Sequence, residues 1–167
     1  MLSLHRELIS LIDQCEQWCV KHRLNTNDVQ LDHVGYRCES AAVFENLRAE
    51  CEKERFIYQS EISQRRIAII GLAEPLKGLF WQTSILELSE PKPGVSESSC
   101  ADHAELYSPS LNYTQLRQYI EGSGIVLIEK QRPHHTTFQC TIDGGITIKL
   151  TQPRLVEKFY AEEINVL

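Results

Sequence analysis

The sequence lacks the features that mark three large classes of protein. Its apolar runs all fall short of the roughly 18 residues that a membrane-spanning helix needs, and its N-terminal residues do not follow the order of regions of a signal peptide. Basic residues number 17 against 23 acidic ones, and this net charge of −6 argues against the basic face that nucleic-acid binding requires. We therefore expect a cytoplasmic protein that binds neither membranes nor nucleic acid.

The cysteines lack the spacing of a disulfide framework or of a zinc ribbon. There is no CxxC pair among the six, which are Cys15, Cys19, Cys38, Cys51, Cys100 and Cys140. Cys15 and Cys19 lie four residues apart in a helical pattern, so they can in principle share a metal or form a redox pair. The favoured interpretation is that all six are reduced and pack as small hydrophobic side chains.

The chain of 167 residues, 42% of them hydrophobic, is long enough to form one globular domain with a core of its own. Apolar residues recur at three- and four-residue steps between Leu4 and Leu24, which predicts an amphipathic helix within residues 1–27. Two longer units follow, at residues 28–91 and 100–152. We predict a further short helix within residues 153–167.

The two longer units share a sequence pattern that indicates a duplication. The dipeptide Asp-His opens a strand-like run in each unit, at Asp32-His33 and at Asp102-His103, and each unit ends in a similar run that stops at a proline. Aligning these prolines, Pro91 and Pro153, places Glu87 opposite Lys149. Matched segments with a histidine near the start and a charged residue at the end suggest a repeated unit that builds one site between its halves.

Both units are predicted to contain a strand, a helix and three further strands, in that order. In the first unit the strands are expected at 31–38, 56–62, 66–71 and 81–89, and the helix at 40–54. In the second unit the strands are expected at 103–107, 125–130, 136–142 and 146–151, and the helix at 113–121. Asp143-Gly144-Gly145 is typical of a turn that closes a hairpin.

Alternation along the strands predicts one apolar and one polar face for each of them. A polar sheet face is ordinarily just hydrated, and each polar residue taken singly favours that interpretation. If the fourth strand of each unit pairs beside its first, however, His33, Glu87 and His103 converge, with Lys149 nearby. Two imidazoles and a carboxylate on one side of a metal leave open positions on the other, as in catalytic zinc and non-haem iron sites.

Three segments, residues 31–38, 81–88 and 102–106, resemble those of the YecM-like family of the vicinal oxygen chelate superfamily, which includes glyoxalases and extradiol dioxygenases. The resemblance runs from about residue 28 to 152. It implies an α+β fold in which two βαβββ modules form a cupped mixed sheet. It also implies a divalent cation (zinc, iron, manganese or nickel) that substrate oxygens chelate from the open side, with His33, Glu87 and His103 in the positions of its ligands.

Lys149 departs from the pattern of the superfamily, many of whose members have a carboxylate at this position. An ammonium group is no ligand while it is charged. Lys149 can instead attract an anionic substrate or, with a lowered pKa, act as a general base, and the alternative is a hydrated lysine at a strand end. Glu105 is a second candidate for moving a proton, and its alternative role is to pair with Arg37.

Three residues are candidates for substrate binding. Arg37 can hold a carboxylate through its two-pronged donor geometry, although an ion pair with Glu105 or Glu87 is an equal alternative. Tyr107 is expected at the mouth of the cup. His135 has the right parity but lies in a loop-like segment, which favours plain exposure to solvent. Asp32 and Asp102 are expected to support strand entry or to accept a proton from a neighbouring group.

The leading functional hypothesis is a divalent-metal-dependent enzyme that acts on a small oxygen-chelating substrate by isomerase, lyase or dioxygenase chemistry. A non-catalytic small-molecule-binding module with the same cup is the alternative. A partner-binding domain that docks through its N-terminal helix ranks last. Because both units lie in one chain, a complete site needs no second subunit, and the protein is expected to be a monomer or a homodimer.

Overall fold

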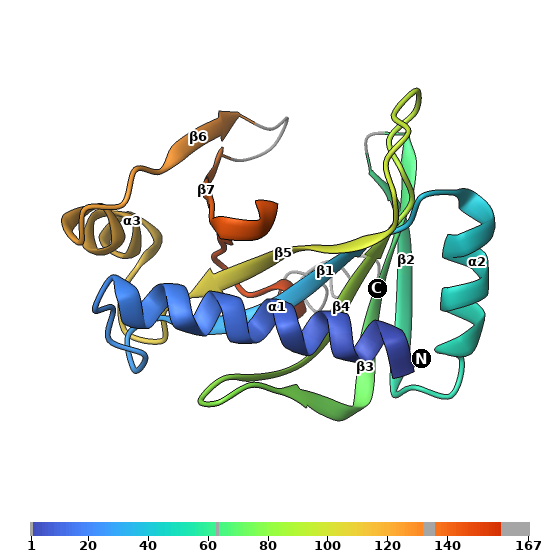
Figure 1. Cartoon of the computed structure of the whole chain (residues 1–167), viewed down its shortest axis with the longest axis horizontal. Helices are drawn as coiled ribbons and strands as arrows, with labels where there is room; N and C mark the ends of the chain where they lie inside the picture. The colour runs from blue at the N-terminus through green and yellow to red at the C-terminus, as the bar shows by residue number, and fades with distance from the viewer. Residues whose placement is uncertain (1, 63, 132–135, 158–167) are drawn as a thin grey trace, which may run out of the picture.

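The computed structural model describes residues 2–62, 64–131 and 136–157, which form one eight-stranded mixed sheet with helices on one face (Figure 1). The first part of the chain forms α1 (Leu2–Lys21), β1 (Gln30–Arg37), α2 (Ala41–Glu50), β2 (Phe56–Ile62), β3 (Arg65–Lys77) and β4 (Gln82–Ser89). The second part forms β5 (Cys100–Tyr107), α3 (Tyr113–Gly122), β6 (Ile128–Gln131), β7 (Thr136–Thr141), the 3-10 turn η1 (Asp143–Gly145) and β8 (Thr147–Leu150). The predicted α+β fold of two βαβββ modules after an N-terminal helix is confirmed.

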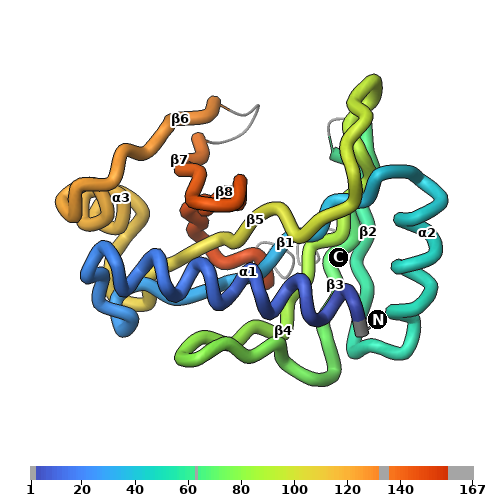
Figure 2. Tube along the Cα trace, in the orientation of Figure 1, coloured from blue at the N-terminus to red at the C-terminus, as the bar shows by residue number. Residues whose placement is uncertain are grey.

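The strand order is β2-β3-β4-β1-β5-β8-β7-β6, so the sheet is open, with β2 and β6 at its edges. In each module the fourth strand pairs in parallel with the first, β4 with β1 and β8 with β5. The modules join where β1 and β5 pair antiparallel, and Figure 2 shows these two strands side by side through the middle of the molecule. The predicted convergence of His33, Glu87 and His103 depends on pairing of the first and fourth strands, and the sheet has this pairing.

The repeat extends to the register of the strands. Val34, which follows His33, pairs with Leu86, and Ala104, which follows His103, pairs with Ile148. The next residues along β4 and β8 are Glu87 and Lys149, so these two occupy equivalent places in the two modules. The alignment that the terminal prolines suggest is the alignment that the sheet adopts.

Two matching bulges interrupt the pairing of β1 with β5. Leu31 pairs with Leu106 and His33 with Glu105, which leaves Asp32 as the extra residue on β1. In the same way, the pairing passes from His103 to Ala101 and leaves out Asp102 on β5. A bulge places two successive residues on the same side of a strand, so each aspartate lies beside the histidine that follows it.

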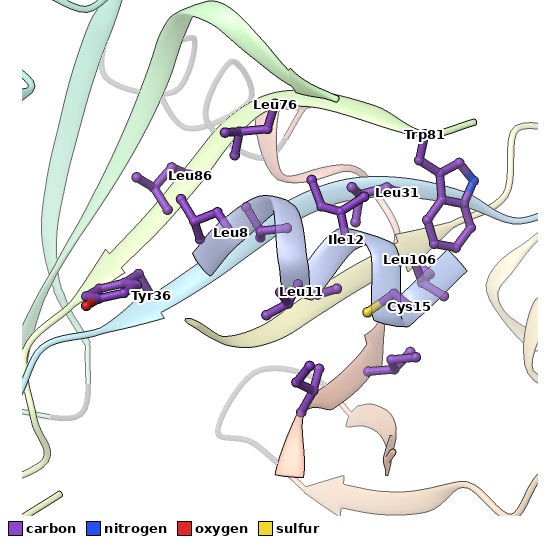
Figure 3. Packing of buried hydrophobic residues seen from close by; sticks show 14 of the residues in the cluster. Leu8, Leu11, Ile12, Cys15, Leu31, Tyr36, Leu76, Trp81, Leu86 and Leu106 are labelled. Atoms are coloured by element: carbon purple, nitrogen blue, oxygen red, sulfur yellow. The ribbon is translucent and has the colours of Figure 1, made fainter. Parts of the chain in front are cut away.

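The helices α1, α2 and α3 cover one face of the sheet, and α1 lies across the middle strands between α2 and α3 (Figure 1). The apolar side of α1 packs on strands of both modules, as Figure 3 shows for Leu8, Leu11, Ile12, Leu86 and Leu106. Local sequence sets the start of the shorter helices. Ser40 is the N-cap of α2 and accepts a hydrogen bond from Val43 N at 3.2 Å, and Asn112 forms a capping box with Gln115 at the start of α3.

The cysteines behave as small hydrophobic residues. All six are free, and every one except Cys100 is buried. Burial is the main cause that raises the pKa of Cys15 to about 12, and it raises the pKa of Cys19 as well. Thiols with such pKa values are protonated at neutral pH and are poor nucleophiles and poor metal ligands.

Several element boundaries differ from the prediction by a few residues, and those of β3 and β6 have a clear cause. β3 continues past Gly71 to Lys77, because a register shift between Gly71 and Leu76 lets its pairing with β4 resume. β6 begins only at Ile128, since Ile125 packs in the core ahead of the strand. The predicted hairpin turn at residues 143–145 is confirmed. It is the 3-10 turn η1 between the antiparallel strands β7 and β8, and its Gly144 and Gly145 adopt φ values of 82° and 81° that favour glycine.

The C-terminal segment begins at residue 153, and its described part, residues 153–157, lies against the face of the sheet that α1, α2 and α3 leave uncovered. Of the predicted C-terminal helix, residues 155–157 are helical, and the remainder lies outside the described residues. Leu155 and Val156 pack on a second, smaller apolar cluster of Ile67, Ile69 and Ile85. Within the described part of the chain, none of the helices combines the length and the hydropathy that crossing a membrane would require.

Candidate metal site

Three predicted ligand residues meet on neighbouring strands, on the face opposite the helices. His33 lies on β1, Glu87 on β4 and His103 on β5, and their ligand atoms all lie within 4.8 Å of one another. Glu87 stands between the two rings, with Oε2 3.8 Å from His33 Nε2 and Oε1 3.8 Å from His103 Nε2. The two rings meet edge to face, with centroids 5.9 Å apart. This group could hold a metal ion.

The two imidazoles are buried and oriented in the same way. Asp32 Oδ2 lies 2.8 Å from His33 Nδ1, and Asp102 Oδ1 lies 2.7 Å from His103 Nδ1. An imidazole that donates from Nδ1 to a carboxylate presents the lone pair of Nε2 on its other side, which is the arrangement of many metal-bound histidines. The paired Asp-His dipeptides therefore orient both Nε2 atoms toward Glu87.

Both Nε2 atoms are buried without a hydrogen-bond partner among the described residues. His33 is 0% exposed and His103 is 3% exposed, so bulk water does not reach the rings freely. A buried polar atom that lacks a partner costs about 1–3 kcal/mol, and such atoms are rare without a functional reason. Two of them that flank one carboxylate fit a divalent cation, because that cation would satisfy both nitrogens and neutralise Glu87.

Gly35 makes room for the second histidine. It pairs with His103 on one side and with Glu87 on the other, so it lies at the centre of the group. A Cβ atom built on Gly35 would lie 2.0 Å from His103 Cε1 and 2.3 Å from its Nδ1. The ring of His103 therefore lies directly over this glycine, in space that no other residue would leave free.

The charges around the site favour positive charge within it. Burial lowers the pKa of His33, but Glu105, Asp32 and Glu87 together outweigh burial, and the pKa is raised above its usual value. Burial raises the pKa of Asp32, and hydrogen bonds from His33, Leu155 N and Arg154 outweigh it, so this pKa is lowered. The site thus combines ionised carboxylates with an imidazole that holds its proton tightly.

Of the two predicted proton-transfer residues, Glu105 lies beside the candidate ligand His33, and Lys149 lies beside Glu105. Lys149 pairs with Glu105 across β5 and β8, and its Nζ is 3.6 Å from Glu105 Oε1. The same Glu105 oxygen is 3.8 Å from His33 Nε2. Glu105 therefore lies between the lysine and the first histidine, at the place in the second module where the first module has Gly35.

The predicted substrate-binding residues are spread more widely. Arg37 forms an ion pair with Glu97 at 2.7 Å and lies 3.8 Å from Asp102, so its partners differ from the Glu105 or Glu87 considered from the sequence. Tyr107 donates a hydrogen bond to Gln30 Oε1 at 2.9 Å. His135 lies outside the described residues. Substrate binding by all three residues stays a prediction.

Arg154 is a neighbour of the site that the sequence analysis missed. Its Nε donates to Asp32 Oδ1 at 3.0 Å, and its guanidinium group lies over the ring of Tyr107, 4.5 Å from the centroid. Arg154 and Asp32 are 122 positions apart, and no local pattern links them. A possible signal is the position of Arg154, directly after the proline that ends the second repeat.

Two comparisons with solved structures support the fold. The chain superimposes on a structure described as "Structural Genomics, Protein EC4020" with a TM-score of 0.77, at 24% identity, covering 97% of this chain and 92% of that one. It superimposes on methylmalonyl-CoA epimerase from Mycobacterium tuberculosis with a TM-score of 0.53, at 16% identity, covering 83% of this chain and 99% of that one. The fold is thus a glyoxalase-type fold, which the chain shares with this epimerase.

Sequence comparison gives the family. Protein YecM of Escherichia coli (strain K12) is 28% identical over 156 residues, which cover 84% of this chain and 81% of that protein. The family model described as YecM protein matches residues 1–162, and this range includes α1, both modules and the start of the C-terminal segment. The chain belongs to the YecM protein family.

Proposed function

We propose that the protein is a divalent-metal-dependent enzyme whose substrate is a small molecule with two adjacent oxygens. His33, Glu87 and His103 would hold the ion. The observation that carries the proposal is the pair of buried Nε2 atoms without hydrogen-bond partners, which flank Glu87 within the described part of the chain. When bound, the ion supplies Lewis-acid polarisation of a substrate oxygen.

Proton transfer next to a carbonyl group is the reaction class that the surrounding residues favour, as in an isomerase or a lyase. Glu105 carries a carboxylate 3.8 Å from His33 Nε2, close enough to take a proton from a substrate carbon held at the site. The ammonium group of Lys149, 3.6 Å from Glu105, forms an ion pair with that carboxylate and attracts an anionic substrate. The epimerase among the proteins of similar fold agrees with this class.

The metal-binding part of the proposal is tested with Glu87→Gln, a change that keeps the shape of the side chain and removes its charge. We expect the untagged parent protein to bind about one equivalent of Zn²⁺ or Mn²⁺, and the variant to bind it roughly 100-fold more weakly, since even outer-shell changes cost about 10- to 100-fold. Dissociation constants from competition with a chromophoric chelator measure the effect.

The matched control for this test is Glu61→Gln, which removes an exposed carboxylate from the edge strand β2. Its dissociation constant should equal that of the parent within about twofold, because surface substitutions away from a site have little effect. Stoichiometric binding that survives Glu87→Gln unchanged, or a parent protein that binds no divalent ion, would refute the metal site.

Metal binding is also expected to weaken as the pH falls, because a histidine binds a metal only as the neutral imidazole. The three carboxylates around His33 raise its pKa above 6.5, so in the metal-free protein a proton already competes with the ion above that pH. The apparent dissociation constant should therefore begin to rise before the pH reaches 6.5. A Zn²⁺ titration between about pH 8.5 and pH 5.5 checks this, and a constant affinity would contradict it.

A non-catalytic small-molecule-binding module is the second candidate function. The observation that favours it is Lys149, which stands in the second module where the first has Glu87 and so leaves the site with three ligands. The two functions differ in chemistry. With metal present, an enzyme of the proposed class exchanges a carbon-bound proton of its 2-substituted acid or ketone substrate for deuterium in D₂O, whereas a binding module binds the ligand without exchange.

A further inference from the structure

Asp32 is held from three directions. Its Oδ2 lies 2.8 Å from His33 Nδ1 and accepts a hydrogen bond from Leu155 N at 3.0 Å, and its Oδ1 accepts one from Arg154 Nε at 3.0 Å. The side chain is only 1% exposed, so these donors, rather than water, determine where the carboxylate lies. Two of the three donors come from the C-terminal segment, which follows the second module.

The other aspartate of the pair has a similar but looser arrangement. Asp102 holds His103 at 2.7 Å, and its other oxygen lies 3.8 Å from Arg37, whose closer partner is Glu97 at 2.7 Å. Asp102 is also more exposed, at 30% of its side chain. Each histidine is thus supported by an aspartate that faces an arginine from the other half of the chain, and the support is tighter at His33.

The orientation of His33 depends on Asp32 because of the bulge. Asp32 is the residue that the pairing of β1 with β5 leaves out, so this ladder does not fix its position. A carboxylate at such a place needs fixed donors to keep the ring beside it in one tautomer and one orientation. Arg154 is suited to this because a guanidinium group stays charged and donates in a fixed plane, which the ring of Tyr107 supports from one side.

We propose that Arg154 is a positioning residue of the metal site, which acts through Asp32 to hold the ring of His33 with Nε2 toward Glu87. The proposal rests on the proposed function for its consequence, which is tighter metal binding, but the orientation of the ring is a property of the metal-free protein. The C-terminal segment is therefore a working part of the site, although it lies outside both modules.

A purely structural role for the segment makes a different prediction. Val156 packs on the apolar cluster of Ile67, Ile69 and Ile85. If the segment acted only by covering that cluster, Val156→Ala would disturb the site as much as a change at Arg154. If Arg154 acts through Asp32, Val156→Ala changes stability alone, and Arg154→Lys, which keeps a cationic donor, recovers part of what Arg154→Gln loses.

The test compares the full-length parent with Arg154→Gln, Arg154→Lys and Val156→Ala in two measurements. In chelator, at an alkaline pH where the rings are neutral, two-dimensional ¹H–¹⁵N spectra of the imidazole nitrogens show which nitrogen of His33 carries the proton. We expect Nδ1–H in the parent and a mixture of tautomers in Arg154→Gln, while His103 keeps its pattern as an internal control. With Zn²⁺, we expect Arg154→Gln to bind about 10-fold more weakly and Val156→Ala to bind within about twofold of the parent.

The two measurements separate this proposal from the proposed function. If the parent binds no Zn²⁺, the metal site is refuted, and the ring spectra alone decide whether Arg154 positions His33. An Arg154→Gln protein with the parental His33 spectrum overturns the positioning role, whatever its affinity for metal. The role is also overturned if Val156→Ala alters the His33 spectrum as strongly as Arg154→Gln does.

Discussion

Replacing Gly35 by alanine is expected to displace the ring of His103 and to disable the metal site, with a loss of affinity beyond the 100-fold that marks the upper end of typical outer-shell changes. The new Cβ would overlap the ring at 2.0 Å from Cε1, a separation that no pair of unbonded carbon atoms tolerates. The ring cannot simply rotate away. It is 3% exposed, and its Nδ1 is held by Asp102 at 2.7 Å.

The same substitution should lower the free energy of unfolding by about 1–3 kcal/mol, the usual cost of inserting a methyl group into a packed region. Two measurements check the prediction, the Zn²⁺ dissociation constant and the midpoint of urea unfolding in chelator. The first reports the displaced ligand, and the second reports the strain in the metal-free protein. Parental metal affinity in Gly35→Ala would show that His103 is not a ligand.

Gly71→Ala is the matched control, since it makes the same chemical change on another strand of the sheet. There the new Cβ would meet the ring of Phe56 at 2.2 Å. Phe56 is 41% exposed at the edge strand β2, so its ring can swing out into solvent. We expect Gly71→Ala to keep the parental metal affinity and to lose less stability than Gly35→Ala. This result would show that the effect of Gly35→Ala arises at the site and is not a general effect of replacing a strand glycine by alanine.

The sequence predicts the modules and the three candidate ligands because both depend on local periodicity. Alternation along 31–38 and 81–89 assigns His33 and Glu87 to one face, and the repeat transfers the assignment to His103. Pairing of the first and fourth strands then brings the three together, and the structure has this pairing. The face assignment holds for Leu86 and Leu88, which lie in the core with α1.

What the sequence does not predict depends on contacts between distant segments. Strict alternation places Asp32 and His33 on opposite faces, and only the bulge in the pairing with β5 brings them together. The contact of Arg154 with Asp32 joins residues 122 positions apart. The polar face also contains an apolar part formed by Ile67, Ile69 and Ile85, which makes sense only once Leu155 and Val156 cover it.

Replacing Glu16 by alanine is expected to lower the free energy of unfolding by about 3–4 kcal/mol. Glu16 is a fully buried carboxylate on α1, and it accepts hydrogen bonds from Leu79 N at 2.7 Å, Phe80 N at 3.0 Å and Trp81 N at 2.6 Å. Alanine leaves these backbone donors without their acceptor. Gly78 is part of the same arrangement, because a Cβ there would lie 2.5 Å from Glu16 Oε1.

Glu16→Gln separates the charge from the shape of this side chain. The amide keeps one oxygen, which can still accept from Phe80 N and Trp81 N, but its NH₂ group would face the N–H of Leu79. We expect a loss of about 1–2 kcal/mol, between the parent and Glu16→Ala. Gln17→Ala, at the exposed neighbouring position of the same helix, should change stability by no more than about 0.5 kcal/mol.

Urea unfolding followed by tryptophan fluorescence suits this series, since Trp81 lies at the end of the loop that Glu16 holds and donates through Nε1 to Val29 O at 3.2 Å. The loop joins β3 to β4, and β4 carries Glu87. If α1 fixes the start of β4 through this carboxylate, Glu16→Ala should also weaken Zn²⁺ binding, by less than Gly35→Ala does. A loss below about 1 kcal/mol in Glu16→Ala would mean that water replaces the carboxylate and that α1 holds the sheet by its apolar side alone.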